Sequence, residues 1–284
     1  MTRTATAASE VSSADHLSPE LRKPLRDLIL TLADNKRLLG IRYSDWMLGA
    51  PTLETGIAAS SMAQDEWGHG RLTYALLGDF GDDPKHLEHG READDYHSSE
   101  LLDGSFGSWS EMIAASLLLD SAFTVQYGAL LESRYRPVHN RVQKLLDEEA
   151  FHFQYAAAWV QRLARAPELS ADLQTSLNRY LPAALRWLGR EGAEGDMALR
   201  EGGVIAMDAD ERRDHLLLRV GPTLEAAGMA SAAGLQNDDG QWVFDGEIAW
   251  DGWDDSTRRS GGSGPDAATL SRVRGDKNRA MLLD

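Results

Sequence analysis

The sequence predicts an all-α protein, a four-helix bundle with additional C-terminal helices. Apolar side chains recur at intervals of three and four residues over long stretches, which is the period of a buried helix face. Helix start signals agree with this pattern, because Ser18 and Pro19 can open one helix and Pro137 another. We expect four long helices at 19–48, 52–78, 108–135 and 137–165, further helices at 170–190, 208–228 and 265–283, and a loop or short hairpin at 235–262.

The composition limits the classes of protein to consider. A chain of 284 residues can bury a large core, and we divide it into a disordered tail (1–17), a helical domain (18–230) and a C-terminal loop and helix extension (231–284). The net charge of −16 argues against a nucleic-acid partner. No apolar run is long enough to cross a membrane and no signal peptide is recognisable, so we expect a cytoplasmic protein. Without cysteine the chain carries no Fe–S cluster, so redox chemistry would draw electrons from another protein.

Two Glu-x-x-His motifs are the most informative feature of the chain. Glu66 and His69 form the first, and Glu149 and His152 form the second. Residues three apart lie on one face of a helix, so each pair can reach one metal ion. Two such pairs on facing helices, with one carboxylate from each of two other helices, make the di-iron or di-manganese site of ferritin-like bundles. The alternative is that both pairs are solvated positions on amphipathic helices.

The remaining carboxylates should lie about 30 residues before each motif, on the preceding antiparallel helix. Asp120 lies 29 residues before Glu149, on the apolar stripe of its helix. A core-facing Asp needs a partner, which is either a metal ion or a buried Arg or His. The position 30 residues before Glu66 is instead occupied by Lys36, which also points inward. Asp34 is roughly 160° away from that face of the helix and misses the site.

Lys36 admits three interpretations. It can pair with Glu66 or Asp120, take the place of one metal ion and leave room for a single ion. It can lie beside an intact two-metal site and donate a proton. It can also mark a degenerate site without metal. Carboxylate-rich ligation with two imidazoles suits iron, as one or two ions, or manganese.

A basic cluster near the end of the chain surrounds the Gly/Ser-rich stretch 260–264. Glycine amides beside arginines suit a phosphate, as on coenzyme A, and the alternative is a flexible tail that balances charge. The cluster comprises Arg258, Arg259, Arg272, Arg274, Lys277 and Arg279.

Residues 32–77 and 118–164 resemble the phenylacetic acid catabolic proteins, the A-type and C-type subunits of bacterial phenylacetyl-CoA epoxidase. The phrase LGAPTLE and its distance from QDEWGHG are similar to the C-type protein. The resemblance implies that the di-iron site belongs to the A-type protein and that the C-type protein is a structural partner without ligands. It places the metal positions of the family on Lys36, Glu66, His69, Asp120, Glu149 and His152, with Lys36 in place of a glutamate.

Our leading hypothesis is a non-heme iron oxygenase, di-iron in the standard pattern, that activates dioxygen and oxidises an organic substrate. Its metal ligands would be Glu66, His69, Asp120, Glu149 and His152. Thr124 lies one turn after Asp120 and could hydrogen-bond a bound oxygen species, or it could bond back to its own helix. Lys36 and Thr124 are therefore the candidate catalytic residues. The resemblance implies an aromatic or acyl-CoA substrate, a separate reductase, and a homo- or hetero-oligomer of related subunits. The rival hypothesis is a non-catalytic structural subunit of such an oxygenase; iron storage fits the extra helices poorly.

Overall fold

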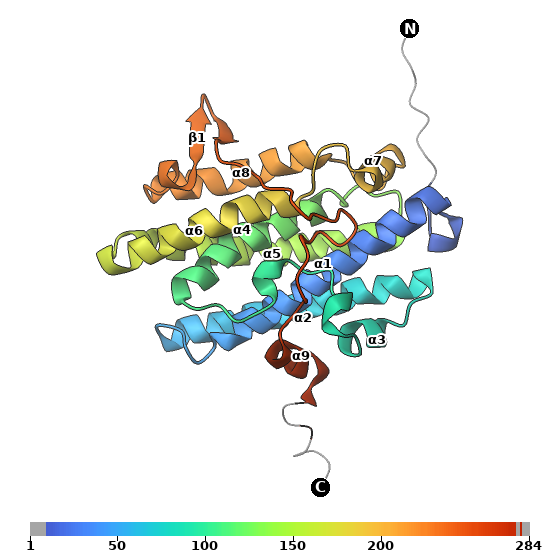
Figure 1. Cartoon of the computed structure of the whole chain (residues 1–284), viewed down its shortest axis with the longest axis horizontal. Helices are drawn as coiled ribbons and strands as arrows, with labels where there is room; N and C mark the ends of the chain where they lie inside the picture. The colour runs from blue at the N-terminus through green and yellow to red at the C-terminus, as the bar shows by residue number, and fades with distance from the viewer. Residues whose placement is uncertain (1–9, 277–278, 280–284) are drawn as a thin grey trace.

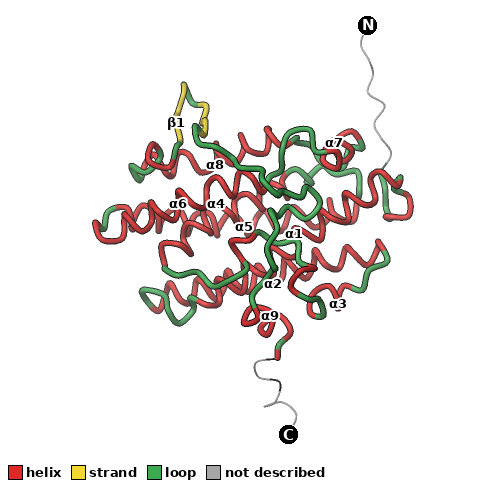
Figure 2. The backbone as a smooth tube through the Cα atoms, in the orientation of Figure 1, coloured by secondary structure: helices red, strands yellow, loops and turns green. Residues whose placement is uncertain are grey.

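The computed structural model describes residues 10–276 and 279, and helices dominate it, as predicted (Figure 1). A single short antiparallel hairpin stands at the periphery, between α8 and α9 along the chain (Figure 2). The elements are α1 (Pro19–Asp45), α2 (Leu53–Leu77), α3 (Pro84–His89), α4 (Trp109–Gly128), α5 (Arg136–Ala164), α6 (Pro167–Trp187), α7 (Glu194–Glu201), α8 (Ala209–Ala226), β1 (Leu235–Asp238), β2 (Gln241–Phe244) and α9 (Ala267–Arg274).

Helix α4 is the centre of the molecule, and α1, α5, α6 and α8 all pack against it. Nearly every side chain of α4 is buried, because the helix is apolar on all sides. Helices α1 and α2 pair on one side of it, and α2 also meets α5. The four long helices α1, α2, α4 and α5 thus form the predicted bundle, and α6 and α8 add a second layer (Figure 1).

Two glycines let α1 and α2 approach closely. A Cβ atom on Gly40 would lie 2.5 Å from the Trp67 ring, and one on Gly70 would lie 3.2 Å from the backbone nitrogen of Arg37. Glycine allows this approach because it has no side chain. The close contact brings Lys36 of α1 opposite Glu66 of α2.

Two boundaries differ clearly from the prediction. Helix α4 ends at Gly128, not at 135, and residues after it form turns before Tyr135 pairs with Val11. Residues 10–17 of the predicted disordered tail are ordered in the structure, because Val11 and Leu17 are buried and Ser13 donates to Asp79 (3.0 Å). Residues 1–9 of that tail lie outside the described residues.

The C-terminal segment also departs from expectation. The short hairpin predicted within 235–262 is confirmed as β1 and β2, with Trp242 buried close to Gly221 of α8. Helix α9 ends at Arg274, because Gly275 adopts a left-handed φ of 74°. The rest of the predicted 265–283 helix lies largely outside the described residues. The short helices α3 and α7 were not predicted, and the division of the chain at residue 230 stays a prediction.

The basic cluster forms neither a phosphate site nor a flexible tail over 258–274. Arg258 and Arg259 are buried; Arg258 pairs with Asp196 (3.1 Å) and Arg259 with Asp103 (2.7 Å). Arg272 pairs with Asp45, and Arg274 with Glu92. These guanidiniums already have carboxylate partners, so the phosphate interpretation is wrong for them. Lys277 lies outside the described residues.

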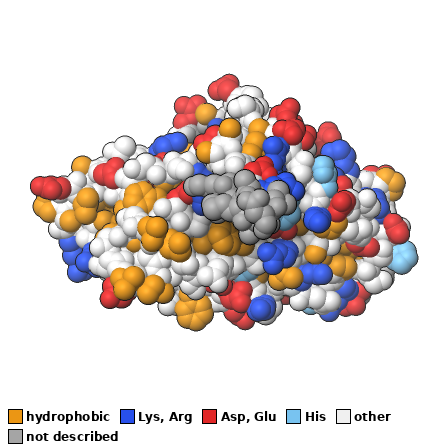
Figure 3. All heavy atoms as spheres, turned by 90° about the horizontal axis from the view of Figure 1, so that it is seen from below, with side chains coloured by type: hydrophobic (Ala, Val, Ile, Leu, Met, Phe, Trp, Pro, Cys, Tyr) orange, Lys and Arg blue, Asp and Glu red, His pale blue; other side chains and the backbone are white. Residues whose placement is uncertain are grey.

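The underside of the molecule carries an exposed apolar patch. Figure 3 shows hydrophobic side chains gathered on the side of the turn between α1 and α2. Apolar residues exposed at this turn are Met47, Leu48, Leu53 and Ile57. Contiguous exposed apolar surface is typical of a contact with another protein. Among the described residues, no helix is sufficiently long and apolar to span a membrane.

Candidate metal centre

The structure brings the seven predicted site residues into one place at the centre of the four-helix bundle. Helix α1 supplies Lys36, α2 supplies Glu66 and His69, α4 supplies Asp120 and Thr124, and α5 supplies Glu149 and His152. All seven side chains are buried. Their common burial follows from the sequence, since each lies on the inner stripe of its helix.

Lys36 is the hub of three ion pairs. Its Nζ donates to Asp120 Oδ1 (2.6 Å), Glu149 Oε1 (2.6 Å) and Glu66 Oε1 (3.1 Å). The side chain is 0% exposed, so these carboxylates replace the water that an ammonium needs. The pairing with Glu66 and Asp120 is the one that the first of the three interpretations requires, and the number of metal ions stays a prediction.

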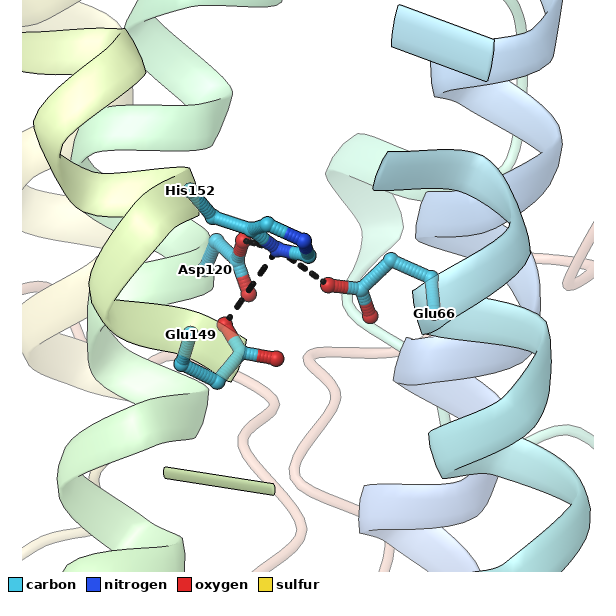
Figure 4. Close-up of side chains that lie close together, drawn as sticks. All are labelled: Glu66, Asp120, Glu149 and His152. Carbon is cyan, nitrogen blue, oxygen red and sulfur yellow. Dashed lines mark ion pairs between the residues drawn. The ribbon is translucent and has the colours of Figure 1, made fainter. Parts of the chain in front are cut away.

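Oxygens of three carboxylates surround the Nδ1 atom of His152 and form a position suited to a second cation, which we call the second cation place. The ring nitrogen Nδ1 lies 3.2 Å from Glu66 Oε1, 3.4 Å from Asp120 Oδ2 and 3.6 Å from Glu149 Oε2. Figure 4 shows the four side chains converging, with Glu66 reaching across from α2 and the others from α4 and α5. Asp120 and Glu149 therefore turn one oxygen toward Lys36 and the other toward His152.

The residues at this second place fit a metal ion. First-row divalent ions lie about 2.1 Å from nitrogen and oxygen ligands, so the ligand atoms around one ion lie roughly 3 to 3.5 Å apart. The contacts of His152 Nδ1 with Glu66 and Asp120 match that spacing, the contact with Glu149 is 3.6 Å, and the ligand atoms of all four residues lie within 4.8 Å of one another. His152 Nδ1 and Glu66 Oε2 are buried and make no hydrogen bond within the described part of the chain. Orphaned polar atoms of this kind are expected where an ion binds.

The charges of the cluster are strongly coupled. Burial alone would lower the pKa of Lys36, but Asp120, Glu149 and Glu66 together raise it well above its usual value. Burial, followed by the charge of Asp120, raises the pKa of Glu66 to about 7. Burial opposes protonation of His152, yet its contacts with Asp120, Glu149 and Glu66 raise its pKa strongly. The metal-free cluster thus holds protons that a metal ion must displace.

His69 faces the lysine rather than the second place. Its Nδ1 lies 3.0 Å from Glu149 Oε1, the oxygen that also accepts from Lys36. Its Nε2 lies 2.8 Å from Glu148, and His152 Nε2 lies 3.3 Å from Asp65. Outer carboxylates of this kind fix the ring orientation of metal-binding histidines. Asp65 and Glu148 were not predicted, although an acidic residue directly precedes the Glu of both motifs and could have identified them.

Two hydroxyl groups complete the site. Tyr43 donates to Asp120 Oδ2 (3.0 Å), and burial followed by the charge of Asp120 raises the pKa of Tyr43 well above its usual value. Thr124 Oγ1 lies 2.9 Å from the carbonyl oxygen of Asp120 and 3.2 Å from Glu149 Oε2. With one proton, Thr124 donates to one of these at a time. The bond back to its own helix is present, and a bond to a bound oxygen species stays a prediction. Tyr127 contacts Thr73 instead (2.8 Å).

Two cavities reach the cluster from different sides. One of about 160 Å³ is lined by His69, Tyr127 and Glu148 among others. The other, of about 430 Å³, is lined by Thr124 and opens between α4, α5 and α8. A larger cavity of about 550 Å³ lies between α1, α7 and residues 254–258, and no residue of the cluster lines it.

The comparison with protein families decides where this chain belongs. Residues 2–250 match the model of the family described as phenylacetic acid catabolic protein. The chain is a member of that family. It is 27% identical over 184 residues to the C subunit of 1,2-phenylacetyl-CoA epoxidase from Escherichia coli (strain K12), a match that covers 63% of this chain and 72% of the relative. The expected resemblance is confirmed, and the relative is one part of a phenylacetyl-CoA epoxidase with several subunits.

Proposed function

We propose that this chain is a non-heme iron oxygenase subunit that binds one iron ion through Glu66, Asp120, Glu149 and His152. The observation that carries the proposal is the second cation place, where an orphaned imidazole nitrogen faces oxygens of three carboxylates. Nitrogen and carboxylate ligands suit iron, with manganese as the next candidate. Lys36 supports one ion rather than the usual two, because its ammonium occupies the place beside His69.

Bound iron would supply the activation of dioxygen, and the residues of this chain hold and orient the ligands. Lys36 holds one oxygen of Asp120 and one of Glu149, and their second oxygens, on the side of His152, would be the ones to hold the ion. Tyr43 donates to the second oxygen of Asp120, and the Thr124 hydroxyl lies within hydrogen-bond distance of the second oxygen of Glu149. We expect the substrate to be an organic acyl group carried as a CoA thioester, as the name of the relative indicates for that protein. A separate reductase would supply electrons, because the chain has no cysteine for a cluster of its own.

A structural subunit without metal is the second candidate. It is favoured by the three ion pairs of Lys36, which already balance part of the carboxylate charge without an ion. Under this alternative the chain would stabilise a catalytic relative, and the exposed turn with Leu48 and Leu53 offers a surface for that contact.

Metal content separates the two candidates. The wild-type protein is made in iron-supplemented and in manganese-supplemented cells and analysed for metal per chain. The double variant Glu149→Ala with His152→Ala tests the ligands, and Asp147→Ala with Gln154→Ala is a matched control, since both control residues are exposed on the same helix. We expect near one iron in the wild type and the control, and near none in the ligand variant.

Oxygen consumption with phenylacetyl-CoA and a chemical reductant then tests the oxygenase itself. One iron per chain and substrate-dependent consumption support the proposal. A folded wild type with no metal under either supplement refutes it and favours the structural subunit. Two irons per chain would show that Lys36 leaves its place, and would restore the di-iron pattern.

A further inference from the structure

A small apolar cavity lies between α2, α4 and α5, and we call it the α2–α5 cavity. Its volume is about 160 Å³. Exposed side chains at its rim, such as Leu72 and Asn140, show that it opens to solvent. An apolar protein cavity of about 150 Å³ stays dry and binds xenon, so this volume suits a molecule of a few atoms. The inner wall is formed by the buried apolar side chains Leu76, Tyr127, Val138, Val142 and Leu145.

The polar groups of the inner wall already have partners. The Thr73 hydroxyl donates to the carbonyl oxygen of His69 (2.7 Å), so the Tyr127 hydroxyl is the donor in its 2.8 Å hydrogen bond with Thr73. Neither hydroxyl hydrogen is left free for a carbonyl group or an anion. A polar molecule would lose its hydrogen bonds to water on entering, which costs about 1–3 kcal/mol for each unpaired group. The wall therefore favours an apolar molecule.

Charged side chains lie at the rim of the α2–α5 cavity. Arg141 Nη1 donates to the carbonyl oxygen of Pro137 (2.7 Å), and Lys144 Nζ lies 3.6 Å from Glu148. These side chains are exposed or half-buried, whereas Leu76 and Val142 of the inner wall are 4% and 1% exposed. The cavity thus changes from polar to apolar with depth, and an apolar solute gains free energy as it moves inward.

His69 separates the α2–α5 cavity from the carboxylate cluster. Its side chain lines the cavity and is buried. Its Nδ1 lies 3.0 Å from Glu149 Oε1, and Glu149 is one of the four ligands that we propose for iron. A molecule in the cavity is therefore one imidazole ring away from the ligand set.

We propose that the α2–α5 cavity takes up dioxygen from solvent and holds it beside the carboxylate cluster. Dioxygen is small and apolar and needs no hydrogen bond, which fits the volume and the paired polar groups of the wall. A CoA thioester is too large, because pockets for drug-sized ligands measure about 300–1,000 Å³. The inference rests on the proposed function, since the cluster uses dioxygen only if it holds iron, but uptake of the gas by the cavity does not require the metal.

Nuclear magnetic resonance of the full chain, freed of metal by a chelator, tests the cavity with xenon and dioxygen as separate probes. Xenon shifts the methyl signals of the residues that it contacts, and paramagnetic dioxygen speeds the relaxation of nearby methyl groups. Leu117 of α4 is the internal control, because it is 0% exposed and does not line the cavity. We expect both effects at the methyl groups of Leu76, Val138, Val142 and Leu145.

Two variants fill the cavity from different helices. Val142→Phe and Leu76→Phe each place a larger side chain on the inner wall, and circular dichroism shows whether each variant is folded. Ile57→Phe is the matched control, since Ile57 also lies on α2, is 61% exposed and does not line the cavity. We expect both filling variants to lose the effects of xenon and dioxygen at Val138 and Leu145, and Ile57→Phe to keep them.

The proposal is overturned if xenon or dioxygen leaves the methyl signals of the wild-type wall unchanged, or if the folded filling variants keep the wild-type response. It is also overturned if phenylacetyl-CoA displaces xenon from these methyl groups, because the cavity would then belong to the organic substrate. Iron content is measured on separate samples. A response to the gases without bound iron refutes only the oxygenase, and bound iron without that response refutes only the cavity.

Discussion

Replacing Lys36 with methionine should destabilise the metal-free protein severely. The ammonium is 0% exposed and lies within 3.1 Å of oxygens from three buried carboxylates. Methionine fills the same space without the charge, so the carboxylates keep their mutual repulsion and lose their shared partner. Removing one partner from a buried ion pair costs about 3–5 kcal/mol of the free energy of unfolding, and we expect Lys36→Met to fall in that range near neutral pH.

The assay is urea unfolding of chelator-treated protein followed by circular dichroism. Lys23→Met is the control, because Lys23 lies on the same helix, is 75% exposed and pairs only with Asp27. An exposed pair of this kind contributes roughly 0–1 kcal/mol, so the control should unfold almost like the wild type. The cost of Lys36→Met should shrink at about pH 5, because the carboxylates can then take up protons.

Metal addition provides the second arm of the experiment. An ion that binds only the folded state stabilises it by about 2.7 kcal/mol when its concentration is about a hundred times Kd. Manganese added to Lys36→Met should therefore recover most of the lost stability. If Lys36→Met unfolds within about 0.5 kcal/mol of the wild type without metal, the ammonium does not balance the cluster and our account of the site is wrong.

Three further predictions concern the surroundings of the cluster. Burial raises the pKa of Glu66 from its usual value of 4.5 to about 7 in the metal-free fold, so the stability of the wild type relative to Glu66→Gln should fall as the pH rises from 4.5 to 7. Urea unfolding at both ends of this range measures this difference in stability. A difference that does not change with pH would show that burial does not hold the proton. Asp65→Asn and Glu148→Gln should each weaken iron binding by about 10- to 100-fold in a competition with a chelating dye, and unchanged affinity would exclude an orienting role. Asp34→Leu should cost about 3–5 kcal/mol, because it leaves the buried Arg91 without its carboxylate, yet iron content should stay at the wild-type level.

The bundle and the cluster could be predicted from the sequence because both depend on local periodicity. Glu66 and His69 share a helix face through their spacing alone, and Asp120 follows from the return path of an antiparallel helix. Lys36 was placed correctly by the same argument, but its three partners come from three other helices, so the sequence left several interpretations open.

The features that were missed depend on contacts between distant parts of the chain. Helix α4 ends at Gly128 because the following turn pairs with the N-terminal segment through Tyr135 and Val11, which no local pattern reveals. The arginines at 258 and 259 look like a surface cluster in the sequence. Their burial is decided by Asp196 and Asp103, which lie in other helices and loops.

The burial of Arg258 has a consequence for how the chain is completed during synthesis. Its guanidinium reaches Asp196, which precedes it by 62 residues, and Gln126, which precedes it by 132. Ribosomes add about 5–20 residues per second, so Asp196 waits roughly 3 to 12 seconds for this cation. Until then the junction of α4, α6 and α7 lacks the buried guanidinium that the C-terminal segment supplies. A truncated protein that ends before this segment would retain the four bundle helices but leave Asp196 without the Arg258 guanidinium.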